Sequence, residues 1–107
     1  MAKNPSLQAQ LRATEKKYGK FDSLDLLIPD LNGILKGKRI RAGDFEKACK
    51  GEFVFCAGAT LLTGLGDVVS GVPYGADDGD PDLPARLIPN SIVPVPWSRK
   101  PMGQAFF

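Results

Sequence analysis

The residues able to do acid–base or nucleophilic chemistry are few and scattered in this sequence. It has no histidine, the side chain that most often serves as a general base near neutral pH. Without histidine, neither a Ser–His nor a Cys–His pair can form. The only glutamates stand on three separate predicted elements, at Glu15, Glu46 and Glu52. We therefore predict that the chain has no catalytic residues of its own and is inactive in isolation.

Two glycine-containing stretches approach nucleotide-binding motifs without completing them. Gly33 to Arg39 contains the lysine of a P-loop, but its glycines are too close together, and Arg39 stands where Ser or Thr would hold magnesium. Gly64-Leu65-Gly66 begins like a dinucleotide fingerprint, but Val69 takes the place of the third glycine and no helix is predicted to follow. We interpret the first stretch as a hairpin and the second as a flexible loop.

The side chains that could bind a metal ion lack the spacing of known sites. A cluster of aspartates is formed by Asp77, Asp78, Asp80 and Asp82. Counted as a calcium loop from Asp78, Leu83 replaces the required glycine and Pro89 the bidentate glutamate. Cys49 and Cys56 are the only cysteines, too few for a four-ligand zinc site without histidine. We predict a solvated acidic loop, no metal site, and two reduced, largely buried thiols, with a disulfide as the alternative.

The elements that must position these residues begin with an N-terminal helix, which we assign to residues 1–20. Ser6 is a suitable N-cap, and Gly19 can end the helix in a left-handed conformation. The apolar residues form one narrow stripe, at Leu7, Leu11 and Tyr18. A stripe this thin is typical of a surface helix that packs on a larger body.

A β-hairpin is predicted next. Residues alternate from Asp22 to Asp30, and one apolar face is formed by Leu24, Leu26 and Ile28. Asn32-Gly33 is the dipeptide best able to take positive φ angles at a tight hairpin turn. Ile34 to Ile40 returns as the second strand. The basic residues there either protect a solvated sheet edge or contact an acidic partner surface: Lys36, Lys38, Arg39 and Arg41.

The residue pattern after the hairpin predicts one short helix. Asp44 can cap it, it runs from Phe45 to Lys50, and Gly51 ends it. Its buried side is formed by Phe45, Ala48 and Cys49.

Short strands and loops make up the remainder. Phe53–Ala57 is predicted as a strand, and glycine, proline and aspartate predict an exposed loop from Gly64 to Asp82. Further strands are expected at Arg86–Ile88 and Ile92–Val95, the second limited to a sheet edge by its prolines. With 107 residues the chain forms about one domain. A hairpin, a helix and further strands predict an α+β fold: a β-grasp-like mixed sheet over residues 21–107, with the short helix packed on one face and the N-terminal helix before it.

Charge and hydrophobicity exclude some partners. The formal net charge of +2 is too close to zero to indicate a nucleic-acid partner. No apolar run approaches the roughly 20 residues needed to cross a membrane. The first residues lack the apolar core of a secretory signal, so we expect a cytoplasmic location.

Four motifs in order resemble the N-terminal domain of the glutamine synthetase family, over residues 21–105. Phe21 to Ile40 resembles that family's opening hairpin, in which a strand ending in Asp-x-x-Gly precedes a Lys/Arg-Gly-Lys return strand. The helix, a loop of small residues and Gly79-Asp80-Pro81-Asp82 keep the family order. Val95-Pro96-Trp97, followed by Arg99, Pro101 and Gln104, resembles the domain's end in the branch that includes γ-glutamylpolyamine synthetases.

The resemblance implies an ATP-dependent ligase that joins glutamate to ammonia or an amine through a γ-glutamyl phosphate. In that family ATP and Mg²⁺ or Mn²⁺ bind in a larger C-terminal catalytic domain, which is absent from this chain. The family forms homo-oligomeric rings, in which the N-terminal domain of one subunit closes over the catalytic domain of its neighbour. By resemblance, we therefore assign Asp80, Asp82 and Trp97 to a subunit interface.

One stretch departs from the family pattern. Classical glutamine synthetases carry Asp-Gly-Ser-Ser after the helix, and that aspartate helps to bind ammonium. The matching stretch here is Cys56-Ala57-Gly58-Ala59, which we assign to a substrate-adjacent loop and which has no carboxylate. Either the nucleophile is a larger amine recognised by other groups, or another carboxylate substitutes. A non-catalytic β-grasp interaction module is the alternative function.

Overall fold

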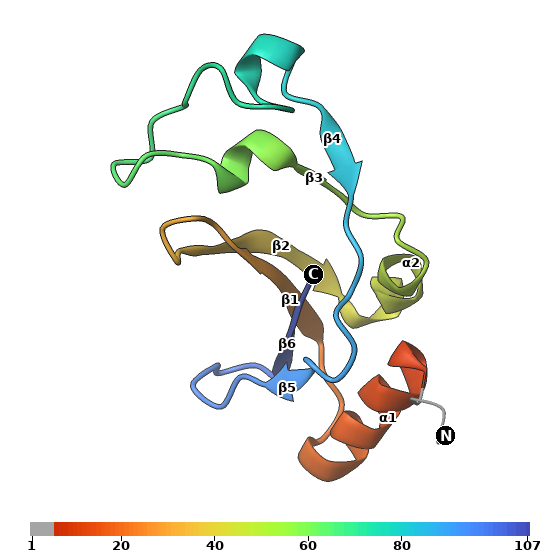
Figure 1. Ribbon diagram of the computed structural model, residues 1–107. Coiled ribbons are helices and arrows are strands. Elements are labelled where there is room, and N and C mark those ends of the chain that lie inside the picture. Colours follow the sequence, from red (N-terminus) through yellow and green to blue (C-terminus); the bar gives the residue numbers. More distant parts are fainter. Residues whose placement is uncertain (1–5) are drawn as a thin grey trace.

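The computed structural model describes residues 6–107 as an α+β fold (Figure 1). An N-terminal helix precedes a four-stranded mixed sheet, and a short helix packs beside it. A separate two-stranded sheet lies at the other end of the molecule. Residues 1–5 of the N-terminal helix predicted over 1–20 lie outside the described residues. Between residues 6 and 107, no helix is long and apolar enough to span a membrane.

The main sheet has the strand order β2-β1-β6-β5. β1 (Ser23–Pro29) pairs antiparallel with β2 (Leu35–Arg41) and parallel with β6 (Met102–Phe106), and β5 (Val93–Pro94) pairs antiparallel with β6. A hairpin whose first strand lies parallel to the last strand, with a helix between them in the chain, is the β-grasp arrangement. The predicted fold class is therefore confirmed.

The core lies on one face of this sheet. The predicted alternation in β1 is confirmed, because Leu24 and Leu26 are 0% and 1% exposed and Ile28 is partly buried against them. The other buried apolar residues of the core come from both helices, β2, β6 and the connections: Leu11, Phe21, Ile40, Phe45, Ala48, Leu87, Ile92, Ala105 and Phe107. Burial of this face accounts for the position of both helices.

The N-terminal helix α1 (Leu7–Tyr18) begins and ends close to the predicted residues. The Ser6 hydroxyl accepts a hydrogen bond from the Ala9 N–H (3.1 Å), which confirms the N-cap. Gly19 has a positive φ of 94° and donates its N–H to the Glu15 carbonyl. The apolar stripe fades toward the end of the helix, since Leu11 is buried but Tyr18 is 55% exposed.

The short helix α2 (Phe45–Cys49) follows a 3₁₀ turn, Ala42–Asp44. Phe45 and Ala48 are buried as predicted. The predicted Asp44 cap is wrong, because its side chain makes no capping hydrogen bond. The residue takes φ −94° and ψ 3° instead of the extended conformation of an N-cap, since it already belongs to the preceding turn. Cys49 and Cys56 are both free thiols and half-buried, so the expectation of largely buried thiols was too strong.

The hairpin between β1 and β2 is confirmed, but its turn is wider than predicted. Asp30 and Ile34 still pair, since the Asp30 N–H donates to the Ile34 carbonyl (2.9 Å). The turn is therefore a three-residue loop in which Gly33 has φ +76° and Asn32 does not have positive φ. The Asp30 carboxylate stabilises this wider turn by accepting the N–H groups of Asn32 (2.8 Å) and Ile34 (2.9 Å).

The second half departs most from prediction. The small sheet pairs β3 (Val54–Cys56) with β4 (Asp82–Pro84), and 3₁₀ turns occupy Ala57–Thr60 and Ala76–Asp78. The strand predicted at Arg86–Ile88 is not formed, and only Val93–Pro94 of the next strand is. Pro84 and Pro89, which lack an N–H, flank the first of these segments. β4 and β6 were not predicted, because neither contains the β-branched residues that mark strands.

Candidate functional site

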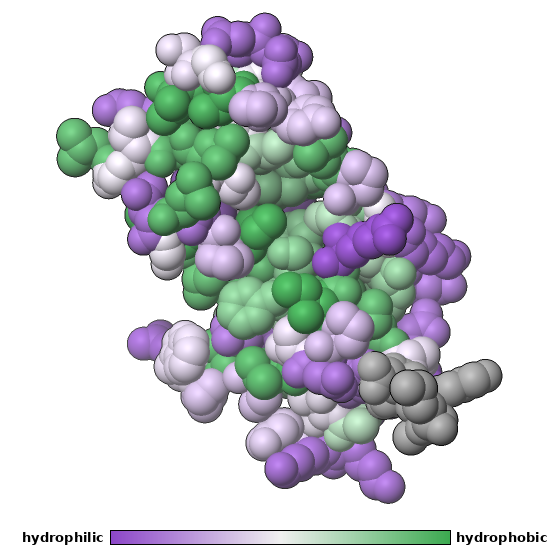
Figure 2. Space-filling model, in the orientation of Figure 1, coloured by the Kyte–Doolittle hydropathy of each residue, from purple (hydrophilic) through white to green (hydrophobic). Residues whose placement is uncertain are grey.

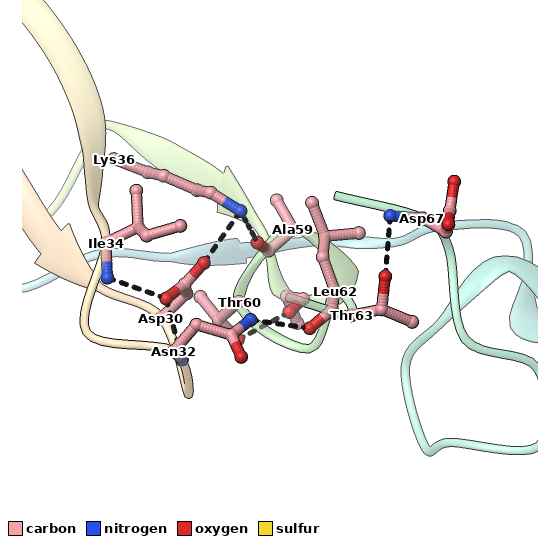
Figure 3. A network of polar contacts seen from close by, with 10 residues as sticks. Asp30, Asn32, Ile34, Lys36, Ala59, Thr60, Leu62, Thr63 and Asp67 are labelled. Atoms are coloured by element: carbon pink, nitrogen blue, oxygen red, sulfur yellow. Dashed lines mark hydrogen bonds and ion pairs between the residues drawn. The ribbon is translucent and has the colours of Figure 1, made fainter. Parts of the chain in front are cut away.

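The tip of the β1–β2 hairpin holds the loop that follows β3 (Figure 3). We call residues 30–36 the hairpin tip and residues 57–63 the 57–63 loop. Three loop carbonyls accept hydrogen bonds from the tip: Ala59 from Lys36 Nζ (2.8 Å), Thr60 from the Leu31 N–H (3.1 Å) and Leu62 from Asn32 Nδ2 (2.9 Å). The sequence predicted the hairpin and, separately, a substrate-adjacent stretch at Cys56–Ala59, and it gave no signal that the two touch.

Asp30 is the buried anchor of this contact. Its side chain is 1% exposed, and Oδ2 lies 3.0 Å from Lys36 Nζ. The Ile34 N–H, together with Lys36 and the Asn32 N–H, holds the pKa of Asp30 below its usual value, against the opposing effect of burial. Asp30 is therefore charged at neutral pH, and it keeps Lys36 directed toward the 57–63 loop.

The structure brings two of the sequence-predicted groups together. Cys56 pairs with Asp82 across β3 and β4, and the Cys56 thiol donates to the Asp80 carbonyl (3.9 Å). A Cβ atom on Gly58 would lie 3.1 Å from Asp80 Oδ1, so a side chain there would crowd the carboxylate. The stretch that the sequence assigned to a substrate-adjacent loop, Cys56, Ala57, Gly58 and Ala59, is thus next to the segment that contains Asp80 and Asp82. Asp82 lies in β4, not in the exposed loop to which the sequence assigned it.

Trp97 does not join this group. Its side chain is 77% exposed, in the connection between β5 and β6. Figure 1 places that connection at the opposite end of the molecule from β3 and β4. The candidate interface residues therefore occupy two separate places on the surface.

The acidic cluster helps to order its own segment. Asp77 Oδ2 accepts the Gly71 N–H (2.6 Å), and Asp78 Oδ2 accepts the Tyr74 N–H (2.8 Å). Tyr74 and Asp80 have positive φ angles of 58° and 49°, which are uncommon for residues other than glycine. Within residues 6–107, no three His, Cys, Asp or Glu side chains are grouped to hold a metal ion. The carboxylates are exposed, as predicted, but two of them hold the backbone of the loop.

Exposed apolar side chains surround the candidate site. Figure 2 shows apolar residues gathered over the part of the molecule where Figure 1 places the chain between β3 and β4. The most exposed large apolar side chains there and on the hairpin tip are Leu31, Ile34, Leu65, Val68 and Tyr74. Val68 (66%) and Trp97 (77%) are exposed, whereas Val69 is half-buried.

A half-open pocket of about 250 Å³ lies beside the 57–63 loop. Its lining includes Ile28, Phe55, Ala57, Thr60, Leu83 and Phe107.

Comparison with known proteins finds a related sequence. No protein-family model matches the chain. It is 32% identical to gamma-glutamylputrescine synthetase PuuA from Escherichia coli (strain K12) over 89 residues, which are 83% of this chain. The chain spans 19% of the length of that relative. This similarity supports a family-level relation to the glutamine synthetase type of ligase, in agreement with the motifs.

Proposed function

We propose that this chain is the N-terminal β-grasp domain of a glutamine-synthetase-type ligase, which joins glutamate to ammonia or an amine at the expense of ATP. The similarity to a γ-glutamylputrescine synthetase favours an amine as the nucleophile. So does the stretch Cys56–Ala59, which lacks the aspartate that serves ammonium in classical members of the family.

The observation that carries this proposal is the grouping of three separate motifs at one end of the molecule. The 57–63 loop contacts the hairpin tip, and Cys56, directly before that loop, contacts Asp80 and pairs with Asp82, although these segments are far apart in the sequence. These segments belong to three of the four motifs on which the family resemblance rests. In the proposal, this end of the domain forms part of the wall of an active site that is shared between subunits.

Asp80 is the carboxylate best placed to serve an amine in this proposal. Its Oδ1 lies against Gly58, inside the stretch that takes the place of the family's Asp-Gly-Ser-Ser. A carboxylate attracts a cationic amine and favours the charged form of its partner. An amine with a second positive charge would use such a group to orient its far end.

The part of the chain between residues 6 and 107 groups no three metal-ligating side chains, and the sequence has no histidine. In the proposal, ATP and Mg²⁺ or Mn²⁺ bind in a separate C-terminal catalytic domain. The contribution of this chain is to shape and close the site, not to activate glutamate.

A neighbouring subunit of a homo-oligomeric ring is the proposed partner of the exposed apolar surface. Leu31, Leu65 and Val68 would be costly to leave in water if nothing covered them. Coverage by a catalytic domain would bury this surface beside the 57–63 loop.

The experiment is an assay of phosphate release from ATP by the complete protein that contains this chain. Glutamate is supplied with ammonia, ethanolamine, putrescine or a longer polyamine. We expect turnover that requires glutamate and is fastest with one of the larger amines. Fastest turnover with ammonia would remove the preference for an amine but keep the ligase.

A non-catalytic interaction module remains the second candidate, because the exposed apolar surface would serve any partner. Absence of amine-dependent turnover would favour this module over the ligase. Binding of the chain to a partner would then be its whole function.

A further inference from the structure

The hairpin tip binds the 57–63 loop through main-chain atoms of the loop. The hydrogen bonds between them end on the carbonyl groups of Ala59, Thr60 and Leu62. A carbonyl is present whatever the side chain, so these bonds fix the path of the loop without restricting its sequence. None of these three bonds uses a side chain of the loop.

Lys36 is the centre of this contact. Its side chain is 24% exposed, and its ammonium group lies 3.0 Å from Asp30 Oδ2 and 2.8 Å from the Ala59 carbonyl oxygen. Hydrogen bonds from a charged donor are stronger than neutral ones, and the buried Asp30 carboxylate restricts where that donor can go. Ala59 is the last residue of the candidate stretch Cys56–Ala59. The lysine therefore joins that stretch directly to the main sheet.

We propose that Lys36 is a positioning residue for the amine-facing loop of this ligase, which it holds through Ala59 while Asp30 orients its ammonium group. The inference rests on the proposed function. It assigns the basic residue of the return strand a role that neither of its sequence interpretations, edge protection or contact with an acidic partner, included. Lys38, on the same face of β2, provides the matched control because it is an exposed lysine.

The first test measures amide hydrogen exchange in this chain by NMR. In Lys36→Met we expect exchange of the Leu31 N–H, which donates to the Thr60 carbonyl, to become about tenfold faster. The amides of β1 should exchange as before, and Lys38→Met should leave both unchanged. Lys36→Arg keeps a cation beside Asp30 and should restore most of the protection. Equal exchange in Lys36→Met and Lys38→Met would overturn the inference, and so would equal acceleration throughout β1.

The second test measures steady-state kinetics of the complete protein. A loop displaced by about 1 Å can reduce catalysis up to a hundredfold. We expect Lys36→Met to raise the KM for the amine about tenfold while the KM for glutamate stays within about twofold. Unchanged KM values in Lys36→Met would contradict the positioning role. Absence of turnover in the unsubstituted protein would instead overturn the proposed ligase, and with it the amine-facing role of the loop. The hydrogen-exchange result would still decide whether Lys36 anchors the loop.

Discussion

The main sheet with its two helices and the segment from residue 57 to residue 84 are stabilised in different ways. The sheet and helices bury a continuous apolar core around Leu24 and Leu26. Residues 57–84 contain one buried residue, Gly75. They are ordered by hydrogen bonds that the hairpin tip donates to the carbonyls of the 57–63 loop and by backbone N–H groups that donate to Asp77 and Asp78. Polar contacts at a surface contribute little net free energy, so we expect the first region to be stable and the second to open locally. The candidate site belongs to the second region, whose shape a partner can still adjust.

The largest expected effect contrasts an apolar truncation in each region. Leu24→Ala should lower the free energy of unfolding by about 2–5 kcal/mol, because it leaves a cavity in the core. Val68→Ala removes an exposed side chain and should change it by less than about 0.5 kcal/mol. Urea denaturation of both variants checks this. Similar losses in the two variants would show that residues 57–84 have a core of their own.

A second contrast compares two glycines. A Cβ atom on Gly37 would overlap the Leu26 carbonyl of the paired strand, whereas the nearest atom to a Cβ on Gly64 is 3.9 Å away. Gly37→Ala should therefore destabilise the protein by about 1–3 kcal/mol. Gly64→Ala should be tolerated, since neither its space nor its φ angle opposes a side chain. The melting temperatures of both variants test this. They show whether the backbone leaves too little room for a Cβ atom in the sheet but not at Gly64.

A third prediction concerns pH and the contact between the regions. The folded pKa of Asp30 is lowered, so its contribution is complete above the ordinary value of 3.8 and is lost as the pH falls through the lower folded value. Between pH 7 and 5 we expect the protection factor of the Leu31 N–H against hydrogen exchange to stay the same. Below 3.8, this protection factor should fall before those of the β1 amides do. Asp30→Asn should abolish this pH dependence, and a simultaneous loss at all amides would show that the regions unfold together.

The smallest effect is expected from Asp80 and depends on the proposed function. Asp80→Asn should raise the KM for a cationic amine about two- to fivefold, because the carboxylate is exposed to solvent. Asp82→Asn, two residues further along at the start of β4, is the control and should leave that KM unchanged. An equal increase in both variants would indicate a general effect of charge rather than a contact with Asp80. Comparison of the KM values for ammonia and putrescine in both variants separates a general effect of charge from a contact with Asp80.

The difference between elements held by a local apolar pattern and elements held by distant contacts also explains which features the sequence could predict. The alternation of Leu24, Leu26 and Ile28 predicted β1 because one buried face imposes that pattern. Nothing local marks β6, since Met102–Phe106 becomes a strand only by pairing with β1. The residue types of Cys56–Ala59 and Asp80 were visible in the sequence, and their placement side by side was not, because it depends on the pairing of Cys56 with Asp82. Lys36 was interpreted as an edge charge for the same reason: its partner Ala59 is distant in the sequence.

The parallel pairing of β1 with β6 also has a consequence for how this protein is made. Leu24 lies opposite Gly103, so the centre of the sheet joins the beginning of the domain to its end. On the ribosome, the β1–β2 hairpin emerges early but cannot gain its central neighbour until Met102–Phe106 has left the exit tunnel. Such distant contacts slow folding, because a long loop must close before they form. During synthesis the hairpin therefore also exposes the edge of β1 that β6 later covers, where a chaperone or a second nascent chain can pair with it.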